Sequence, residues 1–326
     1  MMAGRWQFLF ILFICLFTIP EKTSAQKIKK EDYFFIDALV QKAGPMKGFG
    51  LQYIVDSITK ECTTALQMTR AFYYWQTHFV SFDRRRKTQK KSKDDASSAL
   101  MERKAASRGL ALMFQAMCTL KKIDCSLVAG TIRYRLKDIG QFDPDEVHYW
   151  NIVTINNTQY LIDVSLGIGS FDEKGKHMIP SYTDAWWLCN RKLFASSHFP
   201  EHPKQQLLEV PINKKEFSQG PIVWPGAIVA GLIPSRSSKG IIRAKQGDST
   251  NMLFNFAGKL NVRSVEMSID DASRIPLNYD FDEFGLSLKL EHPKAGKHKI
   301  ALYFNNSLAF VYVSEVRKNQ ALKKQQ

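Results

Sequence analysis

The chain has 326 residues, enough for two domains, and a hydrophobic content of 44% excludes wholesale disorder. Five cysteines are too few for a disulfide-packed miniprotein, and no apolar run reaches the ~18 residues of a transmembrane helix. The net charge of +15 favours acidic partners, but it does not choose among nucleic acid, membrane surfaces and sulfated glycans.

The N-terminus carries the pattern of a secretory signal. Arg5 precedes an apolar run from Phe8 to Ile19, and the small residues Thr23-Ser24-Ala25 follow. We therefore interpret residues 1–25 as a cleaved signal peptide and expect the mature protein to be secreted and extracellular. An uncleaved anchor is the alternative, but the run is too short to span a bilayer and ends at Pro20.

Secretion affects how the cysteines and asparagines are interpreted. Four cysteines remain after the predicted signal, and their spacing does not fit a zinc site. They can form disulfides or remain as buried free thiols, and the sequence does not decide between these two states. They are Cys62, Cys118, Cys125 and Cys189. Two N-glycosylation sequons begin at Asn156 and Asn305, each between strand-like runs, and we expect both asparagines to lie in exposed turns.

Two helices are predicted in the first half, with a basic segment between them. Apolar residues recur at helical spacing from Cys62 to Phe82 and again from Ser107 to Leu120, where they form one buried stripe. Residues 84–93 contain seven cations in ten positions, a pattern typical of a solvated loop. The cations are Arg84, Arg85, Arg86, Lys87, Lys90, Lys91 and Lys93.

After the second helix the hydrophobic period changes to two. Strands are predicted over residues 126–134, 148–155 and 159–165, and Asn156-Asn157 between the last two suits a tight hairpin turn. Six prolines between Pro200 and Pro234 indicate a connecting stretch. Beyond it, short alternating strands about ten residues apart predict a β-sandwich of about seven strands.

The hairpin brings two polar residues together. A two-residue turn at Asn156-Asn157 makes the numbers of opposed residues sum to 313, so His148 and Asp163 become diagonal neighbours on one face. A carboxylate that holds one imidazole nitrogen is half of a catalytic triad, although an ordinary cross-strand polar pair would look the same. The start of the second helix, where N–H groups and the dipole favour an anion, would place a nucleophile, and Ser107 stands there.

These residues together resemble the transglutaminase-like superfamily, and within it the kyphoscoliosis-peptidase subgroup. The segment from Lys104 to Cys118 is similar to the nucleophile helix, that from His148 to Asn151 to the histidine strand, and that from Tyr160 to Gly167 to the aspartate strand. The segment from Phe194 to Glu201 and Trp75 in the first helix are similar as well. The resemblance covers roughly residues 35–220 and implies an α+β, papain-like or transglutaminase-like core domain. With the boundary near residue 215, where the alternating strands begin to follow the proline-rich stretch, we assign the core domain to residues 26–215 and an all-β sandwich domain to residues 216–326.

The departure from that family lies at the nucleophile. Enzymes of the family use Cys, His and Asp, whereas Ser107 stands at the cysteine position, with His148 and Asp163 retained. A thiolate can form before substrate arrives, but a serine hydroxyl is too weak an acid and needs a base and an oxyanion hole placed for it. Ser107 can thus be a dead position in a binding module, the nucleophile of a Ser-His-Asp hydrolase, or an N-cap without active-site ancestry. Cys118 lies ~16 Å further along the same helix and cannot replace it.

A second motif, His198-Phe199-Pro200-Glu201-His202, fits the H-x-x-E-H pattern of inverted zinc proteases. Pro200 breaks the helix that such a site needs, so we interpret this segment as a rigid exit loop. We expect no metal and no cofactor.

The partner is expected to be an extracellular protein or a sulfated glycan. Residues 84–93 precede the Ser107 helix and would emerge beside the cleft if the family fold holds, as a docking site for anions or as a floppy loop. Nucleic acid is not expected, because the basic run lacks interleaved aromatic residues. The sequence thus predicts a secreted, non-catalytic binding or matrix protein with a degenerate triad, and an amide or ester hydrolase using Ser107, His148 and Asp163 is the alternative.

Overall fold

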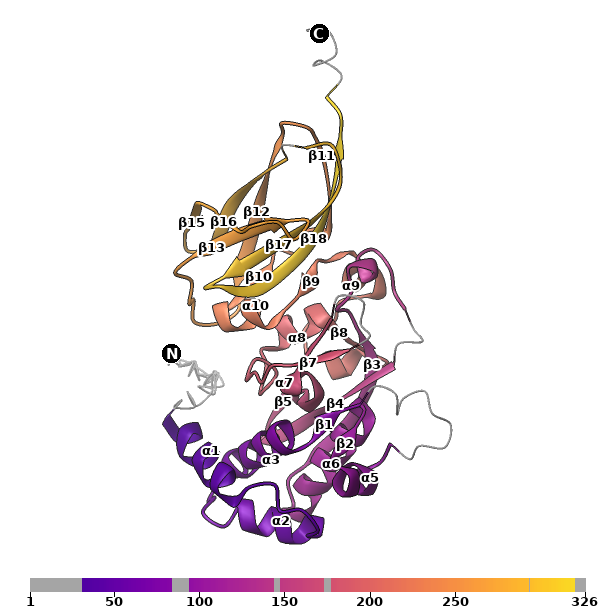
Figure 1. The fold of residues 1–326 in the computed structure, drawn as a ribbon, viewed down its shortest axis with the longest axis vertical. Helices are drawn as coiled ribbons and strands as arrows, with labels where there is room; N and C mark the ends of the chain where they lie inside the picture. The colour runs from indigo at the N-terminus through magenta and orange to yellow at the C-terminus, as the bar shows by residue number, and fades with distance from the viewer. Residues whose placement is uncertain (1–30, 84–93, 144–146, 173–176, 293, 320–326) are drawn as a thin grey trace, which may run out of the picture.

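The computed structural model describes residues 31–83, 94–143, 147–172, 177–292 and 294–319. Helices gather at one end of the molecule and a β-sandwich forms the other end (Figure 1). None of the helices in these ranges has the length and hydropathy that a bilayer span requires. The predicted signal peptide (1–25) and the basic run (84–93) lie outside the described residues.

The helical layer is built around two long helices that the periodicity predicts. α3 (Ala65–Phe79) begins with a capping box between Thr64 and Gln67, and it buries Phe72 and Trp75. α6 (Ser107–Leu120) has the predicted bounds. The other elements of this layer are α1 (Glu31–Ala43), α2 (Leu51–Ile58), β1 (Ser81–Phe82), α5 (Ala96–Glu102) and β2 (Lys104–Ala105). The apolar periodicity predicted neither α1 nor α2.

A four-stranded antiparallel sheet packs against α6, in the order β5-β4-β3-β8. Its strands are β3 (Cys125–Ile132), β4 (Val147–Ile155), β5 (Thr158–Ile162) and β8 (His198–Pro200). Asn156 and Asn157 both have positive φ (49° and 60°), as a two-residue hairpin turn requires. Asn151 pairs with Ile162 and Ile152 with Leu161, so the predicted sum of 313 is confirmed.

The predicted third strand ends earlier than expected. β5 stops at Ile162 because the Asp163 carboxylate accepts the N–H of Leu166 at 3.0 Å and starts the short helix α7 (Val164–Ile168). Ser165 therefore lies in α7 and does not face His148 across a ladder. The expected extension of the strand to residue 165 is wrong.

The segment that follows is richer in structure than its prolines indicate. Pro225 begins a helix, where its missing N–H costs nothing. The elements after α7 are β6 (Gly169–Phe171), β7 (Met178–Pro180), α8 (Arg191–Ser197), η2 (Pro203–Gln206), α9 (Lys214–Gln219), β9 (Ile222–Val223) and α10 (Pro225–Ala230). A further short helix, η1 (Leu136–Asp138), lies earlier in the chain, between β3 and β4. The stretch between Pro200 and Pro234 is therefore a series of short packed elements and not a bare connection.

The sandwich consists of two sheets, one in the order β10-β12-β16-β15 and one in the order β11-β18-β17-β13-β14, with β9 beside β18. The ten strands among the described residues exceed the expected seven, because short edge strands lack a readable alternation. They are β9, β10 (Leu232–Pro234), β11 (Ile241–Lys245), β12 (Ser249–Phe256), β13 (Val265–Ile269), β14 (Ile275–Pro276), β15 (Tyr279–Phe281), β16 (Gly285–Glu291), β17 (Gly296–Phe304) and β18 (Ser307–Arg317).

One cluster of buried apolar side chains runs from the four-stranded sheet into the sandwich. It includes Val128, Trp150, Phe194, Leu232, Phe254 and Phe310. The predicted boundary at residues 215 and 216 falls inside α9 and stays a prediction.

Candidate active site

Ser107 is the first residue of α6 and is 5% exposed. Its helix has no side-chain cap from the N-cap residue, Ala106. Instead, the Asp94 carboxylate accepts the N–H groups of Ala106 and Gly109, both at 3.0 Å. A negative charge is favourable at a helix N-terminus, so Asp94 stabilises the start of α6. The same carboxylate places a negative charge beside the position of the expected nucleophile.

The start of α6 meets the histidine strand. The Ser107 hydroxyl oxygen accepts the backbone N–H of Tyr149 at 3.3 Å, and Tyr149 directly follows His148 in β4. Ser107 forms no hydrogen bond with the His148 ring in the described part of the chain. Segments forty residues apart therefore converge as expected, but the hydroxyl is held by a backbone amide.

His148 and Asp163 are hydrogen-bonded across the hairpin. The distance from His148 Nε2 to Asp163 Oδ2 is 2.6 Å, and the two side chains are 5% and 0% exposed. The diagonal contact that the register predicts is therefore present. Because the hairpin turn sets the register, the Asn156-Asn157 pair indirectly positions this contact.

Asp163 accepts hydrogen bonds from four groups. Besides His148, they are the Ser165 hydroxyl (2.7 Å), the Leu166 N–H (3.0 Å) and His198 Nε2 (3.1 Å). Burial disfavours the charged carboxylate, but the two imidazoles outweigh burial and hold the pKa of Asp163 far below its usual range. Asp163 is therefore an ionised acceptor at neutral pH.

An ionised Asp163 fixes the tautomers of both histidines. It accepts but cannot donate, so we assign the proton of each ring to Nε2. This assignment leaves Nδ1 of His148 as the nitrogen with a lone pair when the ring is neutral. A histidine that assists a nucleophile needs this arrangement, with one nitrogen held by the carboxylate and the other available as a base.

His198 is enclosed by aromatic side chains. It begins β8, is 1% exposed and stacks on Phe194 with ring centroids 3.8 Å apart. Trp150 and Trp186 meet it edge-on, each at 5.1 Å. Burial lowers the pKa of His198, so the ring is neutral at neutral pH, and its Nδ1 lies 2.8 Å from the Ser197 hydroxyl.

Gly130 allows this part of the sheet to close. A side chain at residue 130 would meet the Phe199 carbonyl at 2.2 Å and the Trp150 ring at 2.5 Å. Only glycine therefore lets β8 approach β3 closely enough to bring His198 to Asp163.

His148, Asp163 and His198 also form a group whose potential ligand atoms lie within 4.8 Å of one another. The two nitrogens that face Asp163 are the ones we assign as protonated, and all three side chains are buried. A metal ion would have to displace both protons and separate the hydrogen-bonded pairs. Hydrogen bonds to the Asp163 carboxylate thus explain why His148, Asp163 and His198 lie close together.

Two residues of this site were missed by the sequence analysis. His198 was interpreted as part of an exit loop, and β8 in fact carries it, so the proline that excluded a helix could have indicated a strand end. Asp94 gave no signal, because it caps a helix that begins thirteen residues later and no local capping pattern covers that distance.

Cys62, Cys118, Cys125 and Cys189 are free thiols in the structure. Burial raises the pKa values of Cys118 and Cys189 well above the usual range and that of Cys62 to about 11. These three thiols are therefore protonated at neutral pH. Cys118 lies on the buried face of α6, as predicted, and does not replace a nucleophile at residue 107.

The predicted sequon asparagines lie in two hairpin turns with positive φ. Asn156 is exposed. Asn305 is half-buried, and its amide donates to the Asn261 carbonyl at 2.7 Å while its side-chain oxygen accepts from the Arg263 N–H. The expectation of an exposed residue therefore holds at Asn156 and is wrong at Asn305.

A family model described as the transglutaminase-like superfamily matches residues 52–162, which include Ser107 and His148 and end one residue before Asp163. The kyphoscoliosis peptidase of Homo sapiens is 24% identical over 256 residues, covering 78% of this chain and 38% of its own length. The protein of the same name from Mus musculus is 23% identical over the same shares of the two chains. A crystal structure of a TGase covers 50% of this chain and 39% of its own, at 13% identity and a TM-score of 0.29.

The family match gives the class of this region: residues 52–162, which contain the start of α6 and the histidine strand, match the transglutaminase-like superfamily. Within that class, the chain is related to the kyphoscoliosis peptidases, as the resemblance implies. It spans 38% of the length of these curated relatives.

Proposed function

We propose that this chain is a secreted binding protein that retains the scaffold of a peptidase site but does not catalyse. The observation that carries the proposal is the serine at residue 107, where the enzymes that the resemblance implies have cysteine. Serine cannot supply a preformed thiolate, and thioester chemistry needs sulfur, so transglutaminase-type crosslinking is the activity least compatible with this site.

The surroundings of Ser107 support the same proposal. The hydroxyl is 5% exposed, and its oxygen already accepts the Tyr149 N–H. The Asp94 carboxylate at the start of α6 opposes the negative charge that would develop on an attacking oxygen and on an oxyanion nearby. A nucleophile needs access to substrate and a positive field, and this arrangement offers little of either.

The direct test is labelling with a fluorophosphonate probe, together with a panel of fluorogenic esters and amides. We expect no turnover above buffer and no labelling of Ser107. Labelling at Ser107 that His148→Ala abolishes would overturn the proposal. Ser165→Ala is the matched control, because that hydroxyl also lies near His148, at 3.3 Å, but donates to Asp163.

A Ser107-His148-Asp163 hydrolase of amides or esters is the second candidate. The 2.6 Å contact between His148 and Asp163 favours it, because the assigned tautomer leaves Nδ1 of His148 able to act as a base. For this candidate, Ser107→Ala and His148→Ala should each abolish hydrolysis while the fold is retained.

The partner that we propose is an extracellular protein or a sulfated glycan, bound in part by the cations of residues 84–93. The described residues on either side of this run both contact the segment that leads into α6: the Asp83 N–H donates to the Ala105 carbonyl, and Asp94 caps the helix. Neutralising Arg84 to Lys93 should shift elution from heparin to lower salt, since each lost cation removes a salt-dependent contact. Unchanged retention would remove the basic run from the proposal.

Secretion itself is tested by expression of the full chain in a mammalian secretory host. We expect the mature N-terminus near residue 26 in the medium and a glycan at Asn156, which is exposed in its hairpin turn. Thr158→Ala should abolish that glycan. Retention of the protein in the membrane fraction would favour an uncleaved anchor.

A further inference from the structure

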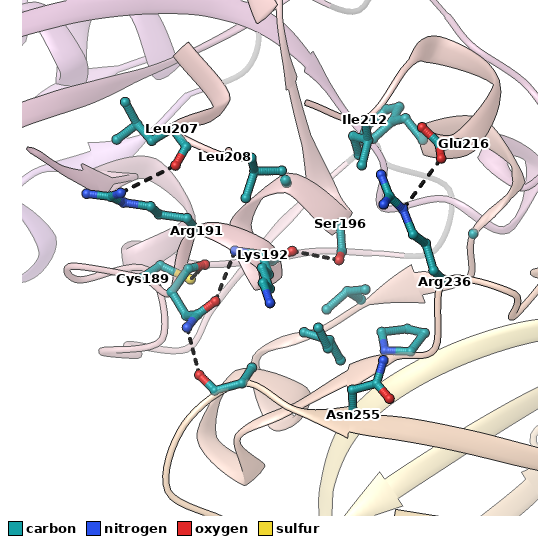
Figure 2. A pocket seen from close by; sticks show the side chains of 18 of the residues that line it. Cys189, Arg191, Lys192, Ser196, Leu207, Leu208, Ile212, Glu216, Arg236 and Asn255 are labelled. Carbon is teal, nitrogen blue, oxygen red and sulfur yellow. Dashed lines mark hydrogen bonds and ion pairs between the residues drawn. The ribbon is translucent and has the colours of Figure 1, made fainter. Parts of the chain in front are cut away.

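A cavity of about 870 Å³ lies where the first half of the chain meets the sandwich, away from Ser107, His148 and Asp163. Figure 2 shows its walls: α8 with Arg191, Lys192 and Ser196, the segment with Leu207, Leu208 and Ile212, and the sandwich side with Arg236 and Asn255. Its volume is within the range of sites for small organic molecules, roughly 300–1,000 Å³.

The lining combines an apolar surface with an excess of cations. Five basic residues line the cavity against two acidic ones, Glu209 and Glu216. The basic residues are Arg133, Arg191, Lys192, Arg236 and Lys239. The apolar ones include Leu207, Leu208, Val210, Ile212, Phe217, Val223, Ile233 and Phe256. Such a wall suits a molecule with an apolar body and a negative group.

Arg133 is the decisive residue, because it is a buried cation that forms no ion pair in the described part of the chain; the Asp138 carboxylate acts on it only from a distance and partly offsets the lowering of its pKa by burial. It is 4% exposed, and its terminal nitrogens donate to the carbonyls of Ser196, Ser218, Gly220 and Pro221. Its Nε has no hydrogen-bond partner, and among the described residues no carboxylate pairs with the guanidinium. Burial lowers the pKa of Arg133 to about 10, which still leaves it charged at neutral pH. Buried charges are normally paired, so a cation of this kind indicates an anionic ligand.

Two cations on α8 also lack a carboxylate partner in the described part of the chain. Arg191 donates only to the carbonyls of Leu207 and Gln159, and Lys192 is exposed. Arg236, by contrast, pairs with Glu216 at 3.6 Å, as the dashed line in Figure 2 marks. Lys239 donates to the Gln219 side-chain oxygen at 2.9 Å and is also without a carboxylate partner among the described residues. The unneutralised charge therefore lies on α8, at Arg133 and at Lys239.

We propose that this cavity is a binding site for a small amphipathic organic anion, with one acidic head group and an apolar body. The head lies toward Arg133 and the α8 cations, and the body lies against the apolar residues of segment 207–212 and the sandwich. The site is independent of Ser107, and it can bind whether or not the chain is an enzyme.

The test measures binding of dodecanoate to the full mature chain by isothermal titration calorimetry, below the critical micelle concentration. Dodecan-1-ol is the matched ligand without charge. We expect one saturable site for dodecanoate and at least tenfold weaker binding of the alcohol. Absence of a saturable site, or equal affinity for the two ligands, would overturn the proposal.

Variants locate the site. The double variant Arg191→Glu/Lys192→Glu should raise the Kd for dodecanoate at least tenfold, since it reverses both charges on α8. The control variant Arg263→Glu/Lys289→Glu makes the same change in net charge at exposed positions of the sandwich and should change the Kd less than twofold. Equal effects of the two variants would mean non-specific attraction and would contradict the proposal.

Arg133→Met removes the buried cation and should weaken dodecanoate binding at least as much. This variant can also unfold the chain, because it removes the hydrogen bonds that Arg133 donates to four carbonyls. Circular dichroism checks the fold, and the α8 variants keep the proposal testable if Arg133→Met does not fold.

Discussion

Asp163 connects three elements of the first domain through one carboxylate. It accepts from His148 in β4, from Ser165 and Leu166 in α7, and from His198 in β8. A charged acceptor of this kind contributes to the fold as well as to any chemistry, because each charge-assisted hydrogen bond is worth about 1.5–3 kcal/mol. Removing the charge of Asp163 should therefore lower the free energy of unfolding, whether or not the chain has catalytic activity.

The first prediction concerns the pH dependence of that stability. Asp163→Asn should lower the free energy of unfolding by about 3–5 kcal/mol at pH 7, because it breaks a buried charged network. The folded-state pKa of Asp163 lies below the unfolded value of about 3.9, so this contribution is complete above pH ~4 and declines as the pH falls. Urea unfolding at pH 7, 5, 4 and 3 measures the difference between variant and wild type.

The difference should be constant from pH 7 to 5 and then narrow by up to about 1.4 kcal/mol per pH unit below pH 4. If the difference in unfolding free energy between variant and wild type were the same from pH 7 to pH 3, the ionised Asp163 carboxylate would have no role in stability. His198 also makes the stability of both proteins sensitive to acid, because burial lowers its pKa in the folded state. Its contribution to the free energy of unfolding is fully present above the unfolded pKa of about 6.5 and is lost as the pH falls.

A second prediction concerns the electrostatic environment of residue 107. In Ser107→Cys, the thiol lies at a helix N-terminus, which lowers its pKa, and near Asp94, which raises it. Asp94→Asn in the same background should therefore lower the thiol pKa by about one unit more. The rate of iodoacetamide labelling against pH, read by peptide mass spectrometry, measures both values.

Ser237→Cys, at an exposed position, serves as the control thiol and should titrate near 8.5. If Ser107→Cys titrates there as well and Asp94→Asn has no effect, the helix start does not form an inherited nucleophile site.

At the scale of elements, the β4–β5 hairpin was the best predicted part of the fold. Its register follows from the two-residue turn and the alternation of apolar residues, both of which are local. The same register predicted the diagonal contact of His148 with Asp163. Only the end of β5 differed, because the Asp163 side chain starts α7 instead of extending the ladder.

The third prediction tests how far the site depends on the turn. Asn157 has φ of 60°, which β-branched residues adopt only with strain. Asn157→Val should cost about 1–2 kcal/mol of unfolding free energy, and Asn157→Gly should be neutral or slightly stabilising. Chemical denaturation of the two variants measures these values, and equal stability of both would contradict the role of the turn.

Contacts between elements distant in the sequence could not be predicted. β8 pairs with β3 about seventy residues earlier, and Asp94 caps a helix across the basic run. No hydrophobic period, residue spacing or turn residue in the sequence predicts either contact, because both depend on how the whole domain packs. His198 and Asp94 were missed for this reason, whereas Ser107 was identified from the local pattern of its helix.

At the scale of the whole molecule, the two halves share apolar packing. Ile139 of the first half clusters with Ile222, Val311 and Val313 on the sandwich, and Asn190 donates to the Ala257 carbonyl at 2.7 Å. The alternation of apolar residues predicted the long strands of the sandwich. It could not predict this shared packing, because alternation identifies the buried face of a strand and not what covers it.

The fourth prediction is that the halves unfold together. Residues 26–326 should show one cooperative thermal transition, and residues 26–215 expressed alone should fail to form a stable monomer, because their contacts with the sandwich become exposed. Calorimetry and size-exclusion chromatography measure this. A monomeric fragment with the melting temperature of the full chain would show instead that the predicted boundary separates independent units.

The four hydrogen bonds at Asp163 have a consequence for comparing distant relatives. A side chain that anchors this much of a domain is retained by selection for folding alone, so it persists in lineages that no longer cleave any bond. Presence of the aspartate and its imidazole partner is then weak evidence of hydrolysis across such a family. The residue at the helix start, whose side chain accepts one hydrogen bond from Tyr149, is the more informative marker of lost or retained chemistry.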